Sequence, residues 1–137
     1  MPKYKFLNVI TSDVMFEAYG KDPKELFQNA AEALFSVICK IKQVKPKEKE
    51  EFEVKANNLE DLMINWLQAL IAIVDTEEKF FSKYEIVEID EIHLKAKLYG
   101  EPIKPELGET VVKAVTMYKF KLEKTDKGYK VTVSLDI

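Results

Sequence analysis

The feature that most constrains the fold is a helical segment at residues 57–77 with an unusually broad apolar face. Asn58 precedes the apolar run and is a good N-cap, because its side-chain oxygen can accept a backbone N–H of the first turn. The apolar residues recur at helical spacing, and further ones widen the stripe: Leu59, Leu62, Met63, Trp66, Leu67, Leu70, Ile71, Ile73 and Val74. A helix with so wide an apolar surface is normally covered by other elements, so we expect it to be largely buried.

A second helix is predicted at residues 22–40. Asp22 is a natural N-cap, Pro23 suits the first helical position, and Glu25 completes an arrangement that resembles a capping box. Apolar residues then recur at helical spacing at Leu26, Ala30, Leu34 and Val37 or Ile38. This segment is the clearest helix of the chain.

The remaining segments predict strands. Residues 3–10 and 13–20 form two short strands or one bent strand, and a charged connector at 44–56 becomes a strand near Glu51. Phe80 and Phe81 fall in a connector, with one of them packing inward. Further strands are expected at 84–90, 91–100, 110–123 and 129–137, with Gly128 in the turn that joins the last two.

This order, β-β-α-β-α-β-β-β-β, predicts an α+β fold in which two helices pack on a largely antiparallel sheet. The chain has 137 residues, about one domain's worth, so we expect a single domain over residues 1–137. No repeat or linker divides it. No apolar run approaches the length of about 18 residues that spans a bilayer, and no secretory signal is recognisable. We therefore expect a soluble, cytoplasmic protein without a membrane partner.

Composition excludes several classes of function. The net charge of −3 does not provide the global positive field of a dedicated nucleic-acid binder. One cysteine and one histidine leave few members for a zinc site or a Cys–His pair. No phosphate-binding glycine loop, metalloprotease motif or hydrolase elbow is present. The Lys-rich stretch 113–130 fits a solvated strand face, with a partner or RNA surface as the alternative.

Three carboxylates point to a metal site. The chain ends in Asp136 and Ile137, whose side-chain and terminal carboxylates are close in sequence, and Asp13 interrupts an apolar strand-like run near the other end. If the last strand is ordered, these oxygens suit a hard cation such as Ca²⁺ or Mg²⁺. The alternative is that Asp13 caps a turn and the C-terminus frays.

The chain resembles the archease family, small proteins that assist the RtcB-type tRNA-splicing ligase. The resemblance covers nearly the whole length and lies in the order and spacing of several segments. These segments are "TSDVMFEAYGK", "ELFQNAAEALF", "NLEDLMINWLQAL", "DTEEKFFSKYE", "LKAKLYGEPIKPE", "VKAVTMYKFKLE" and "VSLDI". The resemblance implies a divalent-metal site at Asp13, Asp136 and Ile137 that holds Ca²⁺ or Mg²⁺, with Mn²⁺ as a further alternative.

Two positions depart from the family pattern. The first segment usually reads His-Thr-Ala-Asp, whereas here Ile10 stands in place of the histidine. Many relatives have Tyr-His where this chain has Met117 and Tyr118. The chain therefore has no imidazole at either position, and the implied site rests on carboxylates alone.

The resemblance implies a non-catalytic cofactor that promotes guanylylation of the ligase and hence its multiple turnover. The ligase would be the protein partner, and tRNA would be met indirectly. Lys113 and Asp75 are candidate partner contacts, although Asp75 equally fits a helix-end residue. Two alternatives remain open: a metal-dependent hydrolase of a nucleotide or phosphoester, and a general chaperone-like protein-binding module.

Overall fold

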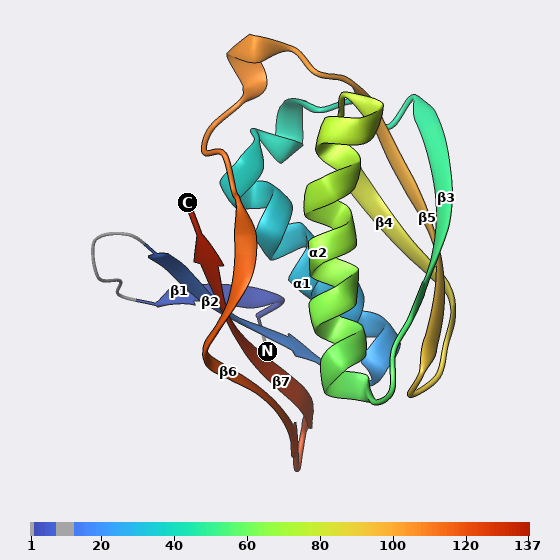
Figure 1. The fold of residues 1–137 in the computed structure, drawn as a ribbon, viewed down its shortest axis with the longest axis vertical. Coiled ribbons are helices and arrows are strands. Elements are labelled where there is room, and N and C mark those ends of the chain that lie inside the picture. Colours follow the sequence, from blue (N-terminus) through green and yellow to red (C-terminus); the bar gives the residue numbers. More distant parts are fainter. Residues whose placement is uncertain (1, 8–12) are drawn as a thin grey trace.

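The fold has the predicted order of helices and strands. The structure, a computed structural model, describes residues 2–7 and 13–137. Its elements are β1 (Tyr4–Leu7), β2 (Asp13–Gly20), α1 (Pro23–Ile38), β3 (Glu48–Lys55), α2 (Leu59–Glu77), β4 (Lys79–Ile89), β5 (His93–Pro102), β6 (Ala114–Thr125) and β7 (Gly128–Asp136) (Figure 1). Two short 3-10 helices, η1 (Ile41–Gln43) and η2 (Pro105–Leu107), lie in the connections. The α+β class is confirmed.

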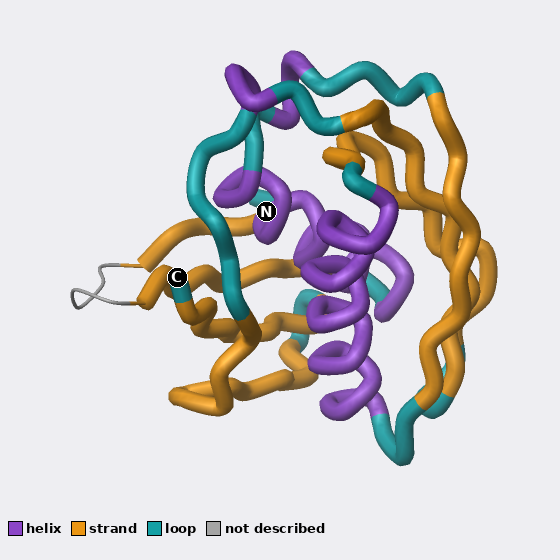
Figure 2. The backbone as a smooth tube through the Cα atoms, turned by 45° about the horizontal axis from the view of Figure 1, so that its top comes forward, coloured by secondary structure: helices purple, strands orange, loops and turns teal. Residues whose placement is uncertain are grey.

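The strands form two sheets where the sequence suggested one. One sheet has the order β1-β2-β7-β6 and the other β3-β5-β4, and the described strand pairs within them are antiparallel. Both helices lie between the sheets (Figure 2). This arrangement follows from the broad apolar face of α2, since a single sheet would leave part of that face in water. Among the described residues, no helix is long and apolar enough to cross a bilayer.

The capping of α1 follows the sequence prediction, with one shift. The Asp22 side chain accepts the backbone N–H of Glu25 at 2.8 Å, as an N-cap should. The Glu25 carboxylate in turn accepts the N–H of Lys21 at 3.0 Å, one residue before the position that a standard capping box uses. At the other end, the carbonyls of Val37 and Ile38 accept N–H groups from the loop at residues 109–110. The loop between η2 and β6 is thereby fixed on the end of α1.

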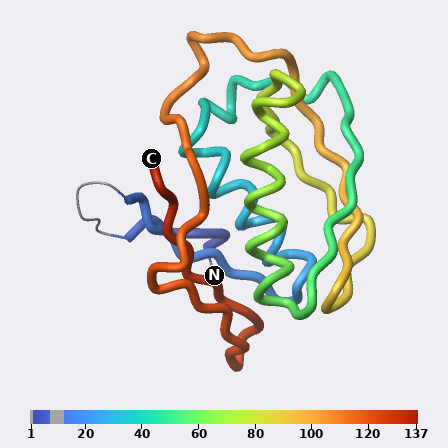
Figure 3. Tube along the Cα trace, viewed as in Figure 1, coloured from blue at the N-terminus to red at the C-terminus, as the bar shows by residue number. Residues whose placement is uncertain are grey.

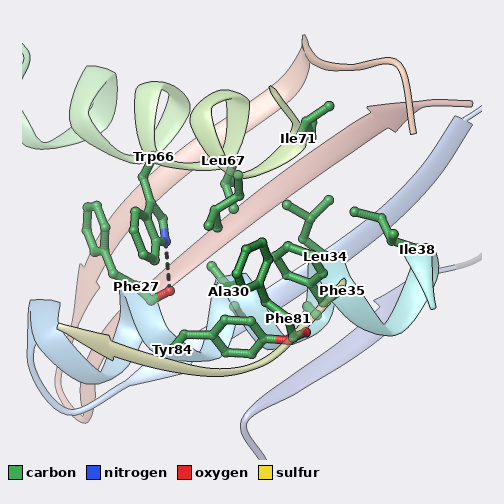
Figure 4. Packing of buried hydrophobic residues seen from close by; sticks show 14 of the residues in the cluster. Phe27, Ala30, Leu34, Phe35, Ile38, Trp66, Leu67, Ile71, Phe81 and Tyr84 are labelled. Atoms are coloured by element: carbon green, nitrogen blue, oxygen red, sulfur yellow. Dashed lines mark hydrogen bonds between the residues drawn. The ribbon is translucent and has the colours of Figure 1, made fainter. Parts of the chain in front are cut away.

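Trp66 links the two helices through the core. Its side chain is fully buried, and its indole N–H donates to the carbonyl oxygen of Phe27 at 3.0 Å (Figure 4). In the same core, the Phe35 ring stacks on the Tyr84 ring, with ring centroids 5.2 Å apart. Trp66 thus meets the polar requirement of its indole while filling the space between α1 and α2.

The connector predicted around Phe80 and Phe81 is wrong, because both residues belong to β4 and both are buried. The reason lies at Glu78, which adopts the left-handed conformation with φ of 52° and ends α2 abruptly. The chain therefore enters β4 at Lys79 without a separate connector. β6 also begins at Ala114 and not at residue 110.

Replacing Trp66 with alanine tests the helix–helix contact. We expect Trp66→Ala to lower the free energy of unfolding by about 3–5 kcal/mol, the usual cost of removing a large buried aromatic side chain. Urea unfolding followed by circular dichroism measures this change. Val87→Ala is the control, since Val87 is 47% exposed, and its effect should stay within about 0.5 kcal/mol. Equal midpoints for the two variants would contradict the assigned packing.

Candidate functional site

The two ends of the chain meet in the four-stranded sheet. Asp13, at the start of β2, lies directly opposite Asp136, at the end of β7. Residues directly opposite in an antiparallel pair have Cβ atoms about 4.5–5.5 Å apart and point to the same face. Both are half-buried on the outer face, since neighbours such as Phe16 and Leu135 point into the core. The structure thus brings together two of the predicted site residues.

Asp136 is held on both sides of its strand. Across from Asp13, the other neighbour of Asp136 is Ala114 of β6. The backbone N–H of Lys113 donates to the Asp136 carbonyl oxygen at 2.8 Å. Ile137 follows directly and is 36% exposed. The last strand is therefore paired up to its end, and the terminal carboxylate of Ile137 is covalently tied to a fixed residue.

Asp13 and Asp136 form an acidic pair across β2 and β7. Neither carboxylate takes part in a salt bridge within residues 2–7 and 13–137. Like charges directly opposite each other across two strands destabilise a sheet. Two carboxylates together with a terminal carboxylate are the oxygen donors that Ca²⁺, Mg²⁺ and Mn²⁺ accept. The residues present therefore fit a divalent cation chemically.

Side chains alone do not complete such a site. In the described part of the chain, no group of three or more His, Cys, Asp or Glu side chains is arranged to hold a metal ion. A cation at the acidic pair would need the terminal carboxylate of Ile137, backbone carbonyls or water for its remaining ligands. Ile10, which the resemblance places at the histidine of the family pattern, lies outside the described residues.

A bulge in β6 lies beside the acidic pair. Thr116 pairs with Ser134, but the next paired residue of β6 is Lys121, opposite Thr132. Residues 117–120 therefore leave the ladder, and the trace of β6 makes an outward loop there (Figure 3). The sequence prediction of a regular strand over 110–123 is wrong at this point. Tyr118, 49% exposed, lies in this bulge.

Ser134 is a residue of this region that the sequence did not single out. It is two positions from Asp136 on β7, so both side chains belong to the same face of the sheet. It is nevertheless fully buried, and its hydroxyl donates to the carbonyl oxygen of Tyr118 at 2.8 Å. The bulge thus covers Ser134. The sequence carries one signal for this bulge. The apolar residues change from odd positions, at Val115 and Met117, to even positions, at Phe120 and Leu122, as an irregularity in the strand requires.

Further along the same face, the lysines are matched by acids. The Lys130 ammonium lies 3.7 Å from Glu17 and 3.6 Å from Glu123, and Lys121 lies 3.4 Å from Glu123. The Tyr19 hydroxyl donates to Glu17 at 2.6 Å, and burial together with this carboxylate raises the pKa of Tyr19 to about 12. These contacts favour the solvated strand face over an RNA surface. They contrast with the acidic pair, which takes part in none of the salt bridges of the described residues.

The two partner-contact candidates lie in different places. Lys113 is exposed and adjoins the acidic pair through its backbone bond to Asp136. Asp75, near the end of α2, lines a separate pocket of about 290 Å³ with Glu109 and mostly apolar neighbours. The residues lining this pocket do not include the acidic pair or Ile137. Only Lys113 therefore belongs to the candidate site.

Comparison with known proteins identifies the family. The model of the archease protein family matches residues 4–137. The chain belongs to the archease family. Protein archease from Sulfurisphaera tokodaii is 38% identical over 141 residues and covers both chains fully. Protein archease from Methanosarcina mazei is 38% identical, and the match covers 98% of this chain and 96% of the Methanosarcina mazei protein.

Solved structures agree with the archease fold. The solution structure of Methanobacterium thermoautotrophicum protein 1598 is 34% identical, covers both chains fully and superposes with a TM-score of 0.85. The crystal structure of an archease from Thermotoga maritima, described as a possible chaperone, is 18% identical with a TM-score of 0.70. This match covers 96% of this chain and 98% of the Thermotoga maritima chain. At that identity, the second likeness concerns the fold alone.

Removing one member of the acidic pair tests the electrostatics. Without divalent cations, Asp136→Asn should raise the free energy of unfolding by about 0.2–1 kcal/mol, because it relieves the repulsion with Asp13. Added CaCl₂ should stabilise the wild type, by about 2.7 kcal/mol at a hundred times its Kd, and stabilise the variant much less. Urea unfolding with EDTA or with CaCl₂, MgCl₂ or MnCl₂ measures both effects.

The matched control is Asp126→Asn, which removes an exposed carboxylate in the turn between β6 and β7. It should respond to each cation as the wild type does. A wild-type unfolding curve that none of the three cations shifts would contradict the cation site.

Proposed function

We propose that this archease is a non-catalytic activator of an RtcB-type RNA ligase. It promotes guanylylation of the ligase, and hence multiple turnover, through a divalent cation at Asp13, Asp136 and the terminal carboxylate of Ile137. The observation that carries the proposal is the acidic pair, placed directly opposite on adjacent strands and left without a lysine partner in the described chain. The proposal places the protein in the cytoplasm, with tRNA as a partner only through the ligase and with no membrane partner.

The chain's own residues supply rigidity and charge. Asp136 is paired to β2 and β6, so its carboxylate has little freedom to move away from Asp13. The exposed Lys113 beside it is suited to an acidic or phosphate group of the partner complex. When bound, a divalent cation supplies positive charge that can neutralise phosphate oxygens at the ligase's site. The archease would thus present a fixed, charged end to another protein's active site.

The histidine content of the chain favours an activator over a hydrolase. Its one histidine, His93, lies on β5 in the other sheet and pairs with Glu53 at 2.9 Å. The acidic pair therefore lacks an imidazole that could serve as a general base. A metal-dependent hydrolase of a nucleotide or phosphoester would have to rely on cation-bound water alone.

A chaperone-like role is the second candidate function. The Thermotoga maritima archease of the same fold is described as a possible chaperone. Exposed apolar side chains support protein binding here as well, notably Val111 at 80% and Met117 at 65% exposure. Such a role would not need the acidic pair.

The test uses purified cognate ligase, an RNA-joining substrate, GTP and Mn²⁺. Adding wild-type archease should convert a single round of joining into multiple rounds. Asp13→Asn, and deletion of Asp136 with Ile137, should each lower the number of turnovers at least about tenfold, because an oxygen donor or charge in the transition-state environment is commonly worth that much. Asp126→Asn is the matched control and should stimulate as the wild type does.

The alternatives predict different results in the same assay. Full stimulation by both acidic-pair variants would contradict the proposal and favour the chaperone-like role. Cation-dependent release of phosphate from a nucleotide without ligase, lost in Asp13→Asn, would favour the hydrolase.

A further inference from the structure

The pairing of β6 with β7 consists of two stretches in different registers. Next to the turn, residues 121–125 of β6 pair with residues 128–132 of β7. Beyond the bulge, Ala114, Val115 and Thr116 pair with Asp136, Leu135 and Ser134. A tight turn sets the register of the stretch that directly follows it. Residues 117–120 stand against Val133 alone and interrupt the ladder, so the turn cannot set the register of the second stretch.

Side-chain contacts fix the second stretch instead. The hydroxyl of fully buried Ser134 donates to the Tyr118 carbonyl oxygen, which joins the bulge of β6 to β7. The Gln68 side-chain oxygen of α2 accepts the backbone N–H of Val115, in the edge strand β6, at 2.7 Å. Of these two side-chain contacts, the Ser134 hydrogen bond is the one that joins β6 to the strand carrying Asp136.

This register matters for the acidic pair. In it, Ala114 lies opposite Asp136, and the Lys113 N–H reaches the Asp136 carbonyl oxygen. A slip of one residue would move every side chain of the short stretch to the opposite face and break that bond. The end of β7 would then be held by β2 alone, and Asp136 with the terminal carboxylate would be free to fray.

We propose that Ser134 is a positioning residue for the acidic pair. Its hydrogen bond to the Tyr118 carbonyl sets the register in which β6 pairs Ala114 with Asp136, and this pairing holds the side of Asp136 that faces away from β2. Ser134 touches neither the cation nor the ligase in this role. The inference rests on the proposed function, because it concerns the same cation site.

The first readout is the affinity for Ca²⁺ alone, measured by isothermal titration calorimetry without ligase. Ser134→Ala should weaken binding about tenfold, because losing the hydroxyl leaves the Tyr118 carbonyl oxygen without its buried donor. Ser134→Thr keeps the hydroxyl and should stay within about twofold of the wild type.

The second readout is hydrogen exchange at the Lys113 amide, followed by NMR. If Ser134 sets the register, this amide should exchange about tenfold faster in Ser134→Ala, since its bond to Asp136 opens more often. Amides in the stretch next to the turn should keep their wild-type rates. General destabilisation would instead raise exchange in both stretches.

The matched control is Ser36→Ala. Ser36 also donates its hydroxyl to a backbone carbonyl, that of Ala33 at 2.7 Å, but within α1. Its removal should leave Ca²⁺ affinity and Lys113 exchange unchanged. If Ser134→Ala does not fold, Ser134→Cys carries the same test, because a thiol keeps the volume but is a weaker donor.

Wild-type affinity and wild-type Lys113 exchange in folded Ser134→Ala, or in Ser134→Cys where the alanine variant does not fold, would overturn the inference. Other results would count against the proposed function without deciding the role of Ser134. A wild type that binds no divalent cation removes the site from that proposal, while Lys113 exchange still shows whether Ser134 sets the register. Normal Ca²⁺ binding with no ligase stimulation contradicts the proposed function and leaves the inference standing.

Discussion

The burial of α2 determines the architecture on which everything else depends. Its apolar residues extend around too much of the helix for one sheet to cover, so the strands divide into two sheets with both helices between them. The four-stranded sheet draws on both ends of the chain, with β1 and β2 from the beginning and β6 and β7 from the end. In that sheet, the pairing of β2 with β7 places residues 13 and 136 on neighbouring strands.

The acidic pair is a local cost that the rest of the fold tolerates. Two half-buried carboxylates face each other across β2 and β7, whereas the lysines further along the same face are paired with Glu17 and Glu123. A sheet selected for stability alone would have an opposite charge at one of the two positions. Local departures from the favoured pattern are expected at functional sites. The contrast between the two halves of one face is the physical basis for placing function at this end.

Much of the fold could be predicted because its signals are local. Asp22 and Asn58 cap the two helices as their positions before apolar periodic segments indicate. The order of the strands followed from the same periodicity. The division into two sheets could not be read in this way, since strand pairing depends on contacts far apart in sequence. The burial of both Phe80 and Phe81 was missed because it depends on how abruptly α2 ends at Glu78.

The candidate site was predictable only in part. Asp13 and Asp136 stood out as carboxylates in the sequence, and the resemblance to archease implied that they lie together. The neighbouring bulge was missed, because the alternation on either side of it suggests one continuous strand and the phase change between Met117 and Phe120 is a weak signal. Ser134 gave no signal of its own, since a serine on the solvent face of a strand is ordinary. Its burial arises only when Tyr118 folds over it.

The position of β7 gives the terminal carboxylate its significance. A C-terminal residue usually frays, so its carboxylate is a poor ligand. Here the last strand lies inside its sheet, between β2 and β6, and Asp136 is paired on both sides. The terminal group of Ile137 is therefore attached to one of the better-fixed backbone positions of the sheet. With no histidine at position 10 or 118, the proposed cation site rests on oxygen donors alone, and the pairing of the interior strand holds the backbone that carries those donors.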